Sequence, residues 1–212
     1  MSEKRFWIAA VLVLTALVAT SAAYGQDEKN EISGMLGRTF VSDQRIVGAT
    51  YINPFVRTGK GLTIEGDYAR RVWVTPLYSI SGEVPVVFNP REKLGSGGDV
   101  VPASYKSFFV TPAARLNLFP TNAVTPWVSF GAGIGHFSES DNLNYFGTNP
   151  GKSTTSATIQ GGVGLDVRLK HRLFLRGEAR DFWSGEPNYP LAATGHSRQH
   201  NYFVSGGVMW RF

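Results

Sequence analysis

The feature that most constrains this chain is an alternation of apolar and polar side chains with a period of two residues. In the last segment Val204, Val208 and Trp210 fall on one parity, whereas Ser205 and Arg211 fall on the other. A period of two is that of a β-strand, because successive side chains on a strand point to opposite faces of the sheet. The chain therefore builds sheet, with two faces that meet different environments.

The same alternation recurs in eight segments. In order, they are 31–41, 61–72, 76–88, 105–119, 124–137, 154–170, 172–183 and 201–212. The first leaves its register open, because Ile32, Leu36 and Phe40 share one parity while Met35 and Val41 share the other. No apolar run after residue 25 is long enough for a membrane-spanning helix. We therefore expect an all-β fold.

The connectors between these segments alternate in length. Those after the first, third, fifth and seventh segments are long and rich in turn-forming residues, whereas the others are short. The long connectors are 42–60, 89–104, 138–153 and 184–198, and the short ones lie around Trp73–Thr75, at 120–123 and at His171. An even strand number with alternating turns and loops is typical of outer-membrane barrels. The pattern predicts an eight-stranded antiparallel up-and-down transmembrane β-barrel.

Charged residues distinguish a barrel from a soluble sandwich. Near the middle of their strands, charged side chains fall on the parity opposite the apolar one, as a lumen charge network: Glu65, Asp67, Glu83, Arg115, Asp166, Arg168, Arg176, Glu178 and Arg180. In a sandwich that parity would face water. In an eight-stranded barrel it faces a lumen that side chains can fill, where acids and bases pair. We expect these pairs to block bulk flow, and we expect Glu178→Ala to leave Arg176 or Arg180 short of a partner.

The first 25 residues resemble a secretory signal peptide. Lys4 and Arg5 precede an apolar run from Phe6 to about Val18, and small residues follow it. The run is too short for a helical membrane anchor. We expect residues 1–25 to be removed, with cleavage after Ala23 or Gly25, and residues 26–212 to form the barrel domain. The chain has no cysteine, so disulfides do not contribute to its stability.

VTPWVSFGAGIGHF (124–137) and the terminal strand that ends at Phe212 resemble strands of small eight-stranded outer-membrane barrels of Gram-negative bacteria, the OmpA-like and porin-like barrels. The resemblance implies a cell outer membrane location, with outer-membrane lipid and lipopolysaccharide as surroundings. It also implies that Val208, Trp210 and Phe212 form a signal for the outer-membrane assembly machinery. We expect no peptidoglycan-binding domain after Phe212, and the oligomeric state stays open.

Other motifs do not favour a cofactor, a metal ion or nucleic acid. GTNPGKS (147–153) has one residue too few for a phosphate-binding loop and leads into a strand instead of a helix. His196 and His200 lie four residues apart in a loop, without an acidic or cysteine partner. The basic residues are scattered and not gathered into a patch. We therefore expect no cofactor, no metal and no nucleic-acid partner.

An esterase site is one alternative. His136 and Ser138 project from one face near the external end of their strand, and lipid A deacylases of this barrel size resemble this arrangement. A serine nucleophile needs a base and an orienting acid. By parity, Glu139 points to the other face. We therefore expect no enzymatic activity.

The remaining expectations concern anchoring and function. Aromatic residues near strand ends suit interfacial girdles, and we assign Trp73, Trp127, Trp183, Trp210, Tyr105 and Tyr202 to them. The sequence predicts a structural or surface-interaction protein that presents four external loops above a side-chain-filled lumen. A narrow channel for small solutes is the other alternative.

Overall fold

The computed structural model describes residues 28–45, 55–58, 61–96, 101–143, 147–148, 153–185 and 198–212. Its strands are β1 (Asn30–Val41), β2 (Gln44–Arg45), β3 (Phe55–Thr58), β4 (Gly61–Val74), β5 (Tyr78–Ser96), β6 (Ser104–Val110), β7 (Ala113–Leu118), β8 (Val124–Glu139), β9 (Ser153–Arg168), β10 (Leu173–Gly185) and β11 (Arg198–Arg211). The expected signal peptide at 1–25, most of 147–153 and His196 lie outside the described residues. Within the described part of the chain, no helix has the length and hydropathy needed to cross a membrane.

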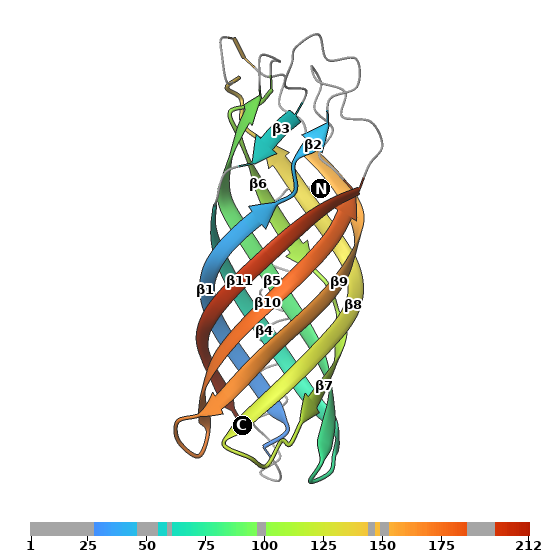
Figure 1. Cartoon of the computed structure of the whole chain (residues 1–212), viewed down its shortest axis with the longest axis vertical. Helices are drawn as coiled ribbons and strands as arrows, with labels where there is room; N and C mark the ends of the chain where they lie inside the picture. The colour runs from blue at the N-terminus through green and yellow to red at the C-terminus, as the bar shows by residue number, and fades with distance from the viewer. Residues whose placement is uncertain are drawn as a thin grey trace, which may run out of the picture.

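The strands form a closed, tilted barrel (Figure 1). Around the ring, β1 pairs with β4, β4 with β5, β8 with β9, β9 with β10, and β10 with β11, all antiparallel. The chain segment of β6 and β7 fills the position between β5 and β8, and β11 returns to pair with β1. The ring therefore has eight positions, and the predicted fold class is confirmed.

The interruption between β6 and β7 has a local cause. It falls at Thr111 and Pro112, and proline has no N–H to donate to a neighbouring strand. The pairing register with β8 is the same on both sides, so the break removes hydrogen bonds without displacing either half. The Ala132 N–H still donates to the Pro112 carbonyl at 3.2 Å. β6 and β7 thus act as one strand of the barrel.

The wall extends further toward the loops than the sequence indicated. β5 continues to Ser96 beyond a bulge between Asn89 and Glu92, and β6 begins at Ser104. The connector predicted at 89–104 is therefore largely strand. The short β2 and β3 pair with each other, and β3 adds to the far end of β5. The loop side of the wall is thus extended by β2, β3 and the last residues of β5.

The opposite end of the barrel carries the short turns and the two ends of the described chain. Thr75 Oγ1 donates to the Tyr78 carbonyl at 2.7 Å and accepts the Tyr78 N–H at 3.0 Å. Phe119 adopts φ 52° in the turn between β7 and β8. Asn30 and Phe212 exchange backbone hydrogen bonds of 2.9 and 2.8 Å. The start of β1 and the end of β11 therefore lie beside each other on the short-turn side.

The two faces of the wall carry opposite chemistry. Leu36 is 63% exposed and Phe130 is 68% exposed on the outer face, whereas charged side chains such as Arg115 are fully buried inside. This inverts the pattern of a water-soluble protein and fits a barrel surrounded by lipid. It also resolves the register of β1, because Ile32, Leu36 and Phe40 point outward while Met35 is buried.

Candidate functional site: the ion-paired interior

Ion-paired side chains from most of the strands meet inside the barrel, in the half nearer the turns. We call this group the interior cluster: Glu31, Glu65, Asp67, Arg71, Glu83, Arg115, Asp166, Arg176, Glu178, Arg180 and Arg211. Each lies on the inward parity of its strand, so the alternation that faces apolar residues to lipid also delivers these charges to the lumen. The structure brings together eight of the nine residues proposed from sequence.

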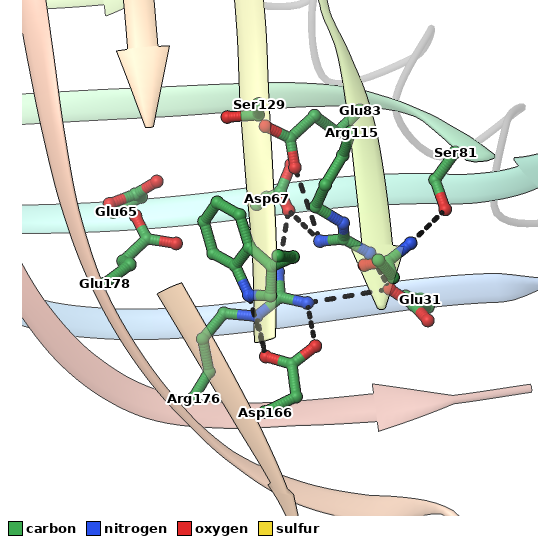
Figure 2. Close-up of polar contacts among 12 residues, drawn as sticks. Glu31, Glu65, Asp67, Ser81, Glu83, Arg115, Ser129, Asp166, Arg176 and Glu178 are labelled. Carbon is green, nitrogen blue, oxygen red and sulfur yellow. Dashed lines mark hydrogen bonds and ion pairs between the residues drawn. The ribbon is translucent and has the colours of Figure 1, made fainter. Parts of the chain in front are cut away.

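Arg176 on β10 bridges two acids from different strands. Its Nε and Nη2 donate to Oδ1 and Oδ2 of Asp166 on β9, at 2.7 and 2.9 Å. Its Nη1 donates to Asp67 Oδ2 on β4 at 3.1 Å. The first contact is the two-pronged guanidinium–carboxylate geometry, which is stronger and more directional than a single bond. Figure 2 shows Arg176 reaching across the lumen between these carboxylates.

Arg115 on β7 approaches the same centre from another side. Its Nη1 lies 3.3 Å from Glu83 Oε2 and 3.7 Å from Asp67 Oδ2, and its Nη2 donates to Glu31 (Figure 2). These acids come from β5, β4 and β1. Arg115 and Arg176 therefore share Asp67, and one carboxylate links strands on opposite sides of the barrel.

Arg180 holds a second group of acids. Its Nε lies 2.6 Å from Glu178 Oε1 and 3.2 Å from Glu65 Oε1, and its Nη1 donates to Glu83 Oε1 at 2.7 Å. Glu65 and Glu178 lie next to each other in Figure 2. The Ser205 hydroxyl lies 3.3 Å from Glu65 Oε2 and 3.5 Å from Glu178 Oε1. One guanidinium thus lies between three carboxylates and reduces the repulsion among them, and Arg115 supplies a second cation to Glu83.

Glu31 links the cluster to the seam where the barrel closes. Its Oε1 accepts from Arg71 Nε at 3.0 Å and lies 2.9 Å from Arg211 Nη2, while its Oε2 pairs with Arg115. Glu31, Arg71 and Arg211 were not in the lumen set proposed from sequence. Parity in the sequence could have identified them as inward-facing, since Glu31 alternates with outward Ile32 and Arg211 alternates with outward Trp210.

The structure places Trp127 inside the barrel and not in the interfacial girdle predicted for it. Only 1% of its surface is exposed, and its ring lies inside the barrel, 5.5, 5.4 and 5.2 Å from the guanidinium carbons of Arg115, Arg176 and Arg180. Its Nε1 donates to Asp166 at 3.3 Å. Cations over an indole face are attracted by the ring quadrupole. Trp127 therefore supports the arginines and does not anchor the barrel in lipid.

Tyr105 was also assigned to the girdle, and it too lies inside. It belongs to a layer of buried apolar side chains nearer the loops, which includes Phe109, Phe137, Phe182 and Phe203. Phe109 packs against three of these rings, with centroid distances of 5.6, 5.0 and 5.5 Å. We call this group the aromatic layer. The other aromatic residues of the predicted girdle point outward: Trp73, Trp183, Trp210 and Tyr202.

Arg168 is the one proposed lumen residue that lies elsewhere. It ends β9, where the next residues turn, and its side chain is exposed. Its Nη2 donates to the carbonyls of Thr121 and Asn122 at 3.0 and 3.2 Å. At a strand end, inward parity points to the neighbouring turn and not to the lumen. Arg168 therefore caps the β7–β8 turn and does not join the interior cluster.

The residues of the alternative esterase site do not come together as a triad. His136 Nδ1 lies 2.8 Å from Thr155 Oγ1 on the adjacent strand. Ser138 follows two residues later on the same outer face, while Glu139 is buried on the inner face. An acid that could orient His136 would have to come from its outer face. At Nδ1, one of the two ring nitrogens, the partner of His136 is the Thr155 hydroxyl and not an acid.

The arrangement inside the barrel neutralises charge and fills space. Arginine stays protonated at all accessible pH values, so each carboxylate of the cluster faces a permanent cation. Among the described residues, no group of His, Cys, Asp or Glu is arranged to hold a metal ion.

The proposed assembly residues lie apart from the cluster, with Val208 and Trp210 exposed on the outer face of β11 and Phe212 following it.

Comparisons with known proteins show similarity in fold. No protein-family model matches this chain, and no curated protein matches its sequence. Among solved structures, Neisserial surface protein A is 10% identical, with a TM-score of 0.54 and coverage of 89% of this chain and 100% of that chain. The outer membrane protein OprG from Pseudomonas aeruginosa is also 10% identical, with a TM-score of 0.54 and coverage of 87% and 95%. The chain therefore has the fold of the small outer-membrane β-barrels.

Proposed function

From this fold, we propose that the protein is an outer-membrane barrel with a closed lumen and a structural or surface-interaction role. The lipid-facing side chains and the short-turn and long-loop ends support this placement. By analogy with such barrels, the turns face the periplasm and the connectors after β1, β5, β8 and β10 face outward. These four external connectors would then provide the surface that contacts other molecules.

The observation that carries the proposal is the reach of the three central arginines across the lumen. Arg115 and Arg176 meet at Asp67, and Arg115 and Arg180 meet at Glu83. Moving any one of these side chains aside would separate buried charges from their partners, which costs several kcal/mol. The aromatic layer lies between this cluster and the loops and adds a second barrier. A closed barrel is thus favoured over a solute channel.

A non-enzymatic role is part of the same proposal. His136, the residue that would serve as base, is engaged by Thr155 at 2.8 Å. Glu139, the nearest acid in sequence, points into the barrel. The proposed function therefore rests on the stability of the barrel and on the display of its external connectors.

Conductance tests the closed lumen directly. Purified protein in planar bilayers is expected to show no steady openings, because the interior cluster and the aromatic layer fill the pore. Cell fractionation should recover it with the outer membrane, with gel mobility that changes on boiling. Steady, large conductance from the wild type would contradict the closed lumen. Recovery as a soluble periplasmic protein would contradict the membrane placement.

A further inference from the structure

Strand β5 changes its neighbour near the loops, and the change leaves a gap in its pairing. β5 pairs with β4 as far as Phe88 and with β3 from Leu94 onward. On its other edge, the pairing with β6 is interrupted by a bulge between Asn89 and Glu92. Within the described residues, no part of β3 or β4 pairs with residues 89–93, so Glu92 lies in this gap.

The side chain of Glu92 points inward and fills the gap. The residue is fully buried, and a Cβ added at Gly61 would overlap its carboxyl group. Gly61 is the first residue of β4, and β3 ends shortly before it in the chain. Because Gly61 has no side chain, the carboxyl can lie against the backbone at the junction of β3 and β4.

Glu92 lacks the partners that usually accompany a buried acid. Both of its carboxyl oxygens are buried, and neither has a hydrogen-bond partner in the described part of the chain. Polar neighbours bond one another instead, since Thr39 Oγ1 donates to Asn89 Oδ1 at 2.7 Å and Asn89 Nδ2 donates to Ser107 Oγ at 2.8 Å. Burial without a cation or a donor disfavours the charged form of a carboxyl group.

The titratable groups that face Glu92 add no positive charge. Tyr105 of β6 is its cross-strand neighbour, and Glu139 of β8 pairs with Tyr105 from the far side. A tyrosine phenol ordinarily titrates near pH 10, at about the upper limit of physiological relevance. The other described residues around these two side chains, from β1, β3, β4 and β11, do not titrate: Thr39, Thr58, Gly61 and Gln199.

This part of the wall lies beyond the lipid-facing band. Lys93 and Lys106 are exposed on its outer face, where charged residues would be unfavourable inside lipid. Burial raises the pKa of the Glu92 carboxyl to about 7, against smaller opposing effects of Thr39 and the Gly61 backbone. The charge of Glu92 therefore changes between acidic and neutral conditions.

The strand beside Glu92 is held by little pairing. β3 has four residues and β2 has two, whereas β4 has 14. We call β2, β3 and residues 92–96 of β5 the loop-side extension. Short elements with few backbone hydrogen bonds open locally at a low free energy. Val56 of β3 is buried among the same apolar side chains as the aromatic layer, so separation of β3 from β5 would expose it.

We propose that Glu92 is a pH-sensitive latch of the loop-side extension. The neutral carboxyl stays buried against Gly61, and the extension is closed. When the carboxyl loses its proton to water, the charged form is stabilised by hydration, which requires β3 to separate from β5. The extension therefore opens more often at neutral than at acidic pH. The consequence, a pH-dependent display of the external connectors, rests on the proposed function, whereas the latch itself does not.

The two forms of the extension define the pH window. In the open form Glu92 has an ordinary carboxyl pKa of about 4.3, whereas its pKa in the closed form is about 7. Between these values the open form has lost its proton and the closed form has not, so the opening constant rises about tenfold per pH unit. The closed form is therefore most stable below the window and loses stability as the pH rises through it.

Cysteine labelling measures this opening. The chain has no native cysteine, so Val56→Cys introduces one buried thiol and Arg57→Cys one exposed thiol. Folded protein in detergent is labelled at several pH values with dilute maleimide, so that the rates report the opening equilibrium. The ratio of the two rates cancels the titration of the thiol. The relative rate at Val56→Cys should rise about tenfold per pH unit from about pH 5 to about pH 7 and then level off.

Two further variants identify the group responsible. Glu92→Gln keeps the shape of the side chain but has no proton to lose, so the relative labelling rate should stay low at every pH. Asp43→Asn is the matched control, because it removes an exposed acid from the same end of the barrel, and it should keep the pH dependence of the wild type. Heat-dependent gel mobility establishes that each variant is folded.

Three results would overturn the latch: a labelling ratio that does not change with pH in the wild-type background, an unchanged pH dependence in Glu92→Gln, or its loss in Asp43→Asn. Conductance and fractionation do not depend on Glu92, because the interior cluster and the lipid-facing wall lie elsewhere. Failure of the latch would therefore leave the closed lumen and the membrane placement standing.

Discussion

At the scale of single residues, the effect of a substitution in the interior cluster depends on how many ion-pair partners the residue has. Arg180 contacts Glu65, Glu83 and Glu178, so removing Glu178 leaves it two carboxylates. Arg176 contacts Asp166 and Asp67, so its main partners do not include Glu178. Of the two arginines named from sequence for Glu178→Ala, Arg180 is therefore the one that loses a partner. Residues with several partners, such as Arg180 and Glu31, are the positions where a single change disrupts the most ion pairs.

Arg180→Met should destabilise the barrel strongly. Methionine fills similar space but leaves three buried carboxylates without their shared cation, and breaking a buried pair in this way costs about 3–5 kcal/mol. Urea unfolding in detergent micelles measures the loss. Arg168→Met is the control, because that arginine is exposed, donates to turn carbonyls and has no acid of the interior cluster as its partner among the described residues. Equal midpoints for the two variants would show that the interior charges are solvated.

At the scale of elements, aromatic rings connect strands that do not pair with each other. Phe109 on β6 contacts Phe182 on β10 and Phe203 on β11, across the lumen from its own strand. Backbone hydrogen bonds join only neighbours around the ring, whereas these contacts join opposite walls. The aromatic layer therefore resists flattening of the barrel cross-section near the loops.

Phe109→Ala should leave a cavity in that layer. A buried Phe-to-Ala change costs about 3–5 kcal/mol through lost transfer energy and the unfilled space. Phe130→Ala removes the same atoms from a lipid-facing site, where detergent refills the space, and should cost about 2 kcal/mol. Urea unfolding of both variants in the same detergent provides the comparison. A loss for Phe130→Ala as large as that for Phe109→Ala would mean that the layer is loosely packed.

The terminal strand carries the proposed assembly signal, and its test needs a suitable control. Phe212→Asp should reduce the yield of inserted barrel, because the change alters the end of β11. Phe119→Asp provides the control, since Phe119 is exposed in a turn at the same end and its φ of 52° suits Asp. Outer-membrane yields are compared by fractionation, and equal yields from the two variants would speak against the signal.

At the scale of the whole molecule, the alternation predicted the fold because a barrel has only two faces and a period of two assigns every residue to one of them. The same rule, applied without exception, would have placed Trp127 and Tyr105 inside. Their positions near strand ends suggest the girdle, but parity is the stronger indicator, and both side chains are buried. The lumen position predicted for Arg168 is wrong because parity no longer fixes the direction of a side chain at the last residue of a strand.

The partners inside the barrel could not be predicted in the same way. Which side chains meet across a lumen depends on the stagger of strands that are distant in sequence. Glu31 and Arg115 are 84 residues apart, and nothing local to either indicates the other.

The seam between β1 and β11 has a consequence for folding. There Arg211 Nε donates to Glu31 Oε1 at 3.0 Å across a separation of 180 residues, and the register runs from Glu31–Arg211 to Val41–Asn201. At such a large sequence separation, the entropy of closing the chain is lost before the strand pairing contributes its favourable free energy. Closure of the barrel is therefore slow. Until the last strand arrives, the sheet has two bare edges that could pair with another chain. The intermediate most exposed to aggregation is therefore a nearly complete barrel that lacks only its final strand.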